Sequence, residues 1–291
     1  MSQTRHKCVR TFATQVRLLE QYPEWVFLQS SPQAYAWVKA DAPDLFERIR
    51  QLINDGRWEA NGAMWVEADT NVPSGESLVR QLLYGKRYFR ERLGVDSQVL
   101  WLPDVFGYSA ALPQILKLAD VHAFITSKIS WSQFNRFPHD AFNWRGIDGT
   151  ELPTQFITTP SDWLSTVDSY NAQVTASELR QQWARFSEKH LLHEPSMSFG
   201  FGDGGGGPNE PILERATRYS GPPKIEAMPQ VKLEPTAKLA ERLVRRADDL
   251  FVWDGELYLE LHRGTYTSHG WLKRFNRKNE IRLHNVEWLA S

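Results

Sequence analysis

Short apolar runs alternate with amphipathic stretches along the whole chain, and this alternation restricts the fold more than any other feature of the sequence. Apolar residues spaced three and four apart from Val9 to Tyr22 predict a helix. Capping residues, prolines and glycines predict further helices that begin at Ser31-Pro32 and Pro43 and that span 74–94, 112–118, 176–190, 235–247 and 271–289. Strands are expected at 25–28, 58–66, 99–102, 123–126, 155–158, 197–201 and 250–261. This order predicts an α/β protein with a mostly parallel sheet, open or closed into a barrel.

Composition excludes several classes of protein. A formal net charge of −1 over 291 residues argues against a nucleic-acid partner, which a basic protein would favour. No apolar run approaches the roughly 18 residues of a membrane span, and the polar N-terminus does not resemble a secretory signal. Cys8 is the single cysteine, so an internal disulfide is impossible and a reducing, cytoplasmic location is expected.

Polar residues follow the predicted strands at their carboxyl ends. In parallel α/β folds, ligands bind beyond these ends, so such residues are candidates for one site. The residues in question are Glu67 and Asp69, Asp104, Lys128, Asp203, and His262 with Arg263.

Asp104 and Asp203 are the two carboxylates with the most distinctive surroundings. Asp104 lies among apolar and aromatic neighbours that include Trp101 and Phe106, and Asp203 precedes four consecutive glycines. Two carboxylates beside an aromatic cleft are the minimal requirement for glycoside hydrolysis. Other interpretations stay open: Asp104 could cap a turn, the glycine run could be a surface loop, and Trp131 and its aromatic neighbours could belong to the core. No His-x-His, His-Glu-x-x-His or Cys-x-x-Cys motif indicates a metal site.

Five segments in order, at 65–77, 101–109, 128–135, 202–208 and 261–268, resemble the cytosolic-type α-mannosidases of glycoside hydrolase family 38. The resemblance implies a distorted seven-stranded β/α barrel and a retaining exo-acting enzyme that removes terminal α-linked mannose from oligosaccharides with the help of a divalent metal, usually zinc. It implies that Asp104 is both nucleophile and metal ligand and that Asp203 is the acid/base. The substrate-binding candidates are Phe106, Asp69, Lys128, Trp131 and His262.

The chain also departs from the family pattern. The barrel of the family opens with a strand ending in His-x-Asp, whereas the match here begins at about Gln3 to Cys8, and a later His-Asp pair would lie beyond Ser291. Of four expected metal ligands, only Asp104 is found. We therefore expect residues 1–291 to form a partial N-terminal catalytic domain, an incomplete barrel lacking its first strand, without the helical bundle and β-sandwich regions.

This pattern favours an inactive fragment of such an α-mannosidase. The alternatives are a non-catalytic carbohydrate-binding remnant and a metal-dependent polysaccharide deacetylase, although no His-x-x-x-His pair supports the latter. The oligomeric state is left open.

Overall fold

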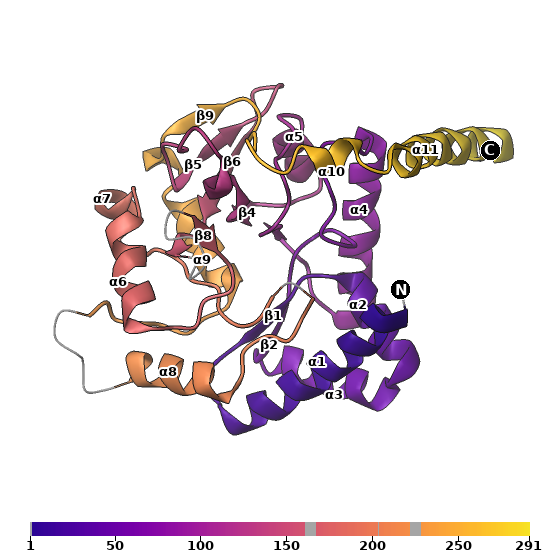
Figure 1. The fold of residues 1–291 in the computed structure, drawn as a ribbon. Helices are drawn as coiled ribbons and strands as arrows, with labels where there is room; N and C mark the ends of the chain where they lie inside the picture. The colour runs from indigo at the N-terminus through magenta and orange to yellow at the C-terminus, as the bar shows by residue number, and fades with distance from the viewer. Residues whose placement is uncertain (1, 161–166, 203, 222–227) are drawn as a thin grey trace.

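The computed structural model describes residues 2–160, 167–202, 204–221 and 228–291, which form a mixed α/β fold (Figure 1). The α-helices are α1 (Ser2–Gln21), α2 (Pro32–Asp41), α3 (Pro43–Asn54), α4 (Gly75–Tyr88), α5 (Leu112–Leu118), α6 (Ala176–Arg185), α7 (Lys189–Leu192), α8 (Glu210–Ser220), α9 (Thr236–Arg245), α10 (Gly264–Thr267) and α11 (Gly270–Ala290). A π-helical turn η1 (Phe89–Leu93) and the 3₁₀ turns η2 (Lys128–Trp131) and η3 (Ala247–Asp249) complete the helical elements. The strands are β1 (Phe27–Gln29), β2 (Trp58–Ala60), β3 (Val99–Trp101), β4 (Ala123–Thr126), β5 (Ala141–Arg145), β6 (Glu151–Phe156), β7 (Thr159–Pro160), β8 (Asp168–Ser169) and β9 (Val252–Asp254).

Within the described residues, the strands form three separate sheets. β1 and β2 pair in parallel, the second sheet has the order β3-β4-β6-β5-β9, and β7 and β8 pair antiparallel. The parallel pairs β3–β4 and β4–β6 agree with the predicted parallel sheet. The hairpin β5–β6 differs from it, because Asp148 and Gly149 form a tight turn that returns the chain antiparallel. No closed barrel is formed by these residues.

Local sequence signals predicted several elements correctly. α5 and β4 occupy the predicted spans 112–118 and 123–126. The Ser74 hydroxyl accepts a hydrogen bond from the Ser77 amide at the start of α4, as expected of an N-cap. The helix continues through η1 to Gly94, whose φ of +71° ends it in the left-handed conformation that glycine adopts readily.

Other predictions were wrong. The expected strand at 197–201 makes only isolated bridges, through Phe199 and Phe201, and the long strands at 58–66 and 250–261 shorten to β2 and β9. β5 and α8 were not predicted. The sequence of β5, Ala-Phe-Asn-Trp-Arg, mixes polar and apolar residues too briefly for a clear alternation, yet all but its last residue are buried.

Two large apolar clusters hold the molecule together. One cluster packs around the five-stranded sheet and includes Tyr108, Phe124 and Trp144. The other lies among α1, α2, α3 and the β1–β2 pair and includes Phe12 and Trp58. Most of the large aromatic residues in these clusters therefore serve the core. α11 extends away from the body, and none of its residues is buried (Figure 1). Among the described residues, no helix combines the length and apolar character needed to span a bilayer.

Candidate active site

Asp104 lies in the turn that follows β3, and contacts from β4 and its following loop fix this turn. The Leu102 amide donates to the Ile125 carbonyl at 3.2 Å, and the Ser127 hydroxyl donates to the Pro103 carbonyl at 2.7 Å. The buried Tyr108 hydroxyl donates to the Leu102 carbonyl at 2.7 Å. The carboxylate is thus held at the carboxyl end of the sheet, where the sequence predicted it.

Two side chains from different segments contact the two oxygens of the Asp104 carboxylate. The Lys128 ammonium forms an ion pair with Oδ1, with Nζ 2.7 Å away, and the Tyr170 hydroxyl donates to Oδ2 at 3.0 Å. The Lys128 side chain is 9% exposed, whereas that of Asp104 is 32% exposed. Asp104 is therefore oriented by the buried Lys128 and the partly exposed Tyr170, and it remains partly accessible.

Aromatic rings surround the Lys128 ammonium. Its Nζ lies 4.1 Å from the ring centroid of Trp131 and 5.3 Å from that of Phe106. The Phe106 ring contacts the His262 ring, with centroids 4.6 Å apart. Burial lowers the pKa of His262, the Lys128 charge lowers it further, and Asp104 opposes both effects. The structure thus gathers five of the predicted site residues: Asp104, Lys128, Phe106, Trp131 and His262.

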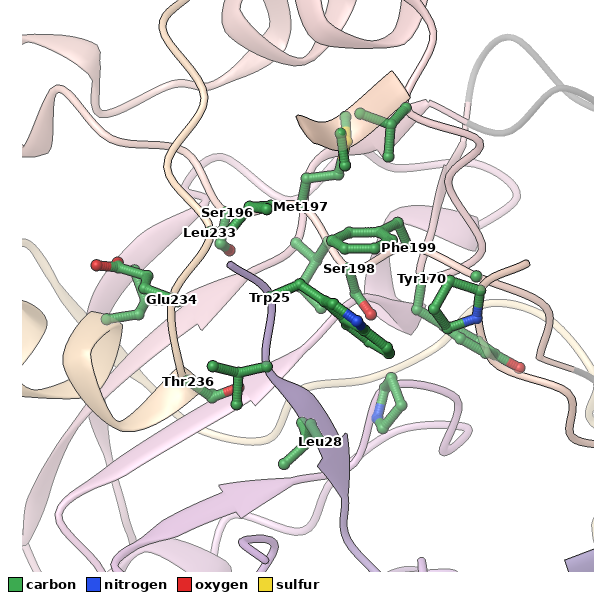
Figure 2. Close-up of a pocket in the computed structure, with 18 of the residues that line it drawn as sticks. Trp25, Leu28, Tyr170, Ser196, Met197, Ser198, Phe199, Leu233, Glu234 and Thr236 are labelled. Carbon is green, nitrogen blue, oxygen red and sulfur yellow. The ribbon is translucent and has the colours of Figure 1, made fainter. Parts of the chain in front are cut away.

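A cavity of about 1120 Å³ opens on the other side of Asp104. Figure 2 shows its wall, with Trp25 and Leu28 from the β1 segment facing Met197 and Phe199, and with Tyr170 and the segment from Leu233 to Thr236 around them. Apolar side chains with a few polar groups, arranged in this way, are typical of a site for a small organic ligand.

The glycine run lines the same cavity. Gly204, Gly205, Gly206 and Gly207 all have positive φ, and a Cβ on Gly207 would meet Gln15 at 2.9 Å and Phe27 at 3.0 Å. The buried Gln15 side chain donates to the Gly206 carbonyl at 2.5 Å and to that of Pro208 at 3.1 Å. The loop is therefore packed against α1 and β1. Asp203, the predicted acid/base, lies outside the described residues.

Glu67 also lines this cavity. One of its carboxylate oxygens accepts a hydrogen bond from the Ser30 hydroxyl at 2.9 Å. Desolvation by the surrounding protein raises the pKa of Glu67 to about 7, and the negative charge of Asp104 contributes in the same direction. Glu67 is nonetheless exposed as a residue, because it faces the cavity.

Asp69 is located differently from the other predicted residues. Its two carboxylate oxygens accept hydrogen bonds from the amides of Asn71 and Val72, at 3.1 and 3.0 Å, which closes a local turn. Asn71 in turn donates to the Phe106 carbonyl at 3.2 Å and to the Tyr266 hydroxyl at 2.8 Å. Asp69 does not line the cavity, and Asn71 links it to the backbone of Phe106.

The described residues do not fit a zinc site. No group of three His, Cys, Asp or Glu side chains lies close enough together within them to hold a metal ion. The one predicted ligand, Asp104, already has the Lys128 ammonium against Oδ1. Zinc sites in proteins use three or four protein ligands, so a single ion-paired carboxylate cannot form one.

Tyr170 is the site residue that sequence reasoning missed. It lies in an irregular segment after β8, with no strand, helix or motif to mark it, and its link to Asp104 spans 66 positions. Glu67 carried a usable signal, because it follows a predicted strand as Asp69 does.

Comparisons with known proteins show the family of the chain. Residues 1–256 match the model of the glycosyl hydrolases family 38 N-terminal domain, and residues 260–291 match that of the alpha mannosidase middle domain. The chain is 41% identical over 288 residues to alpha-mannosidase G of Dictyostelium discoideum, and 40% identical over 289 residues to human alpha-mannosidase 2C1. Both matches cover 99% of this chain but only 26% and 27% of those proteins.

A solved structure shares the fold. The crystal structure of an alpha-mannosidase from Enterococcus faecalis V583 superposes with a TM-score of 0.68 and 18% identity, covering 87% of this chain and 28% of that one. The chain spans about a quarter of the length of the curated relatives that it matches. Because the family model covers most of the chain, this chain belongs to glycosyl hydrolase family 38.

Proposed function

We propose that the chain carries the nucleophile and part of the sugar site of a retaining exo-α-mannosidase, an enzyme that hydrolyses terminal α-linked mannose. The observation that supports this most strongly is the position of Asp104: at a strand end, fixed from the β4 side, oriented by Lys128 and Tyr170, and open to a large cavity. Alpha-mannosidase relatives that match nearly the whole chain support the same activity.

In this proposal, a carboxylate oxygen of Asp104 attacks the anomeric carbon while the glycosidic bond breaks, which gives a glycosyl ester. Asp203 gives its proton to the departing oxygen, then takes a proton from the water that cleaves the ester. Lys128 pairs with Oδ1 and holds the carboxylate in place. Tyr170 donates to Oδ2, so its hydroxyl must release or share that oxygen as the ester forms.

We further propose that the described residues belong to an incomplete seven-stranded β/α barrel, with residues 1–291 forming part of the catalytic domain. Two parallel strands, β1 and β2, stand apart from the sheet that carries Asp104, which fits such a barrel. Zinc would need ligands from outside the described residues, and no step above passes through it. We therefore expect this chain alone to bind mannosides without turning them over.

The experiment that tests the nucleophile is hydrolysis of an aryl α-mannoside by the product of the longest reading frame that contains this chain. We expect Asp104→Asn to lower kcat/KM by about a thousandfold or more, because it removes the attacking group. Asp248→Asn makes the same chemical change at an exposed position in η3 and should leave the rate unchanged. Equal rates for the two variants would disprove the role of Asp104.

A further inference from the structure

The cavity beside Asp104 holds a carboxylate that the mechanism above does not use. Glu67 follows an irregular segment that packs between α2 and α4. The Trp65 amide donates to the Gln81 carbonyl at 2.9 Å, and the Val66 amide donates to the Gln81 side chain at 3.1 Å. The backbone just before Glu67 is thus fixed, and its side chain is directed at the cavity wall by the Ser30 hydrogen bond.

Three of the carboxylates that line this cavity, those of Glu59, Asp104 and Glu67, have different partners. The Glu59 carboxylate accepts hydrogen bonds from the backbone amides of Thr236 and Ala237, at 2.7 and 2.8 Å, so both of its oxygens are bound to the start of α9. Both oxygens of Asp104 are in contact with Lys128 or Tyr170. Glu67 uses Oε1 for Ser30, and Oε2 has no hydrogen-bond partner among the described residues.

We infer that Glu67 is a substrate-binding residue, whose Oε2 accepts hydrogen bonds from hydroxyl groups of the mannosyl unit bound beside Asp104. This inference rests on the proposed function, because it takes a mannoside as the occupant of the cavity. A sugar presents several adjacent hydroxyl donors, and a carboxylate is the strongest acceptor that a protein offers them. Oε2 of Glu67 can accept these hydrogen bonds without breaking a contact that the structure shows.

The groups around Glu67 make its capacity to accept hydrogen bonds depend on pH. Desolvation raises the pKa of Glu67, and the charge of Asp104 raises it further. Lys128 is ion-paired with Asp104, and Glu59 accepts hydrogen bonds from the start of α9. Burial holds the pKa of the neighbouring Tyr108 hydroxyl far above its ordinary value, so this group stays neutral. His262 has a lowered pKa and is uncharged near neutral pH. Glu67 therefore gains its full acceptor capacity as pH rises through about 7.

The test is the binding of methyl α-mannoside to the full chain, followed by tryptophan fluorescence, since Trp25 and Trp101 line the cavity. We expect Glu67→Gln to raise Kd about tenfold, the usual effect of losing a hydrogen bond to a charged group. Glu24→Gln is the matched control, because Glu24 is exposed just before β1 and does not line the cavity. Its Kd should equal that of the wild type.

A purely structural role of Glu67 would not reproduce the expected pH dependence. The wild-type Kd should fall between pH 6 and pH 8, whereas that of Glu67→Gln should stay constant. Glu67→Asp keeps the charge but places it farther from the ligand, so this variant should bind weakly and its Kd should still depend on pH. It also provides a second test of the role of Glu67 if Glu67→Gln does not fold. Binding by the wild type that Glu67→Gln retains within twofold would overturn the role of Glu67 alone. No binding by the wild type would overturn the proposed function together with it.

Discussion

Replacing Lys128 with methionine should destabilise the fold by about 3 kcal/mol. Breaking a fully buried ion pair costs about 3–5 kcal/mol and an exposed pair contributes less than about 1 kcal/mol. With Lys128 at 9% and Asp104 at 32% exposure, we place the loss of this pair at about 2 kcal/mol. Loss of the cation contacts with Trp131 and Phe106, at 4.1 and 5.3 Å, adds about 1 kcal/mol. Methionine has a similar length, so little cavity forms.

Urea denaturation of the full chain measures this loss, and a double-mutant cycle with Asp104→Asn separates the ion pair from the ring contacts. We expect a coupling of about 1–2 kcal/mol, because once Asp104 is neutral the missing ammonium no longer leaves a charge unpaired. Lys117→Met is the control on the exposed face of α5 and should change stability by less than about 0.5 kcal/mol. If the losses of the two single variants simply add, within about 0.5 kcal/mol, the ion pair contributes nothing and this reasoning is refuted.

Two further predictions concern stability. Ser97→Ala should cost about 2–4 kcal/mol in urea denaturation, because the buried Ser97 hydroxyl accepts the amides of Gly62 and Ala63, at 3.0 and 2.8 Å, and both would lose their partner; a cost under about 1 kcal/mol would contradict this. The pKa of Glu67 is raised from 4.5 to about 7, so the native chain keeps a proton that the unfolded chain releases, and this contribution to stability is complete below pH 4.5 and lost as pH rises through 7. The Tm of Glu67→Gln relative to the wild type should therefore increase from pH 5 to pH 8, and a constant difference would disprove the shift.

Local signals in the sequence predicted the helices better than the sheet. The N-cap at Ser74 and the glycine stop at Gly94 lie within a few residues of each other and act through local geometry, so they can be read directly. The arrangement of β3, β4, β6, β5 and β9 depends on pairing between segments far apart, such as Asn143 with Val252. Short strands with mixed sequences, such as β5, gain their place from this pairing and not from their own pattern.

The same contrast explains what was found of the site. The rule that ligands bind at strand ends pointed to Asp104 and Lys128, which follow β3 and β4 and which the structure brings together. His262 also lies in this group, although β9 ends well before it, at Asp254. The rule could not choose between Glu67 and Asp69. β2 ends at Ala60, and the chain to Val66 is irregular, so the directions of later side chains follow from contacts with Ser97 and Gln81 rather than from strand alternation.

Two of the carboxylates that line the cavity, those of Asp104 and Glu67, have different partners, and this difference assigns them different roles. The Lys128 Nζ lies 2.7 Å from Oδ1 of Asp104 and orients the carboxylate that the proposed mechanism uses as the nucleophile. Glu67 has a neutral hydroxyl donor, Ser30, as its partner; desolvation raises the pKa of Glu67 to about 7, and the negative charge of Asp104 adds to the shift. Removing the ammonium should leave the negative charge of Asp104 unpaired, which should raise the pKa of Glu67 further. The pH dependence of mannoside binding in Lys128→Met would then shift toward higher pH than in the wild type, whereas an unchanged profile would mean that Lys128 does not set the charge state of the cavity.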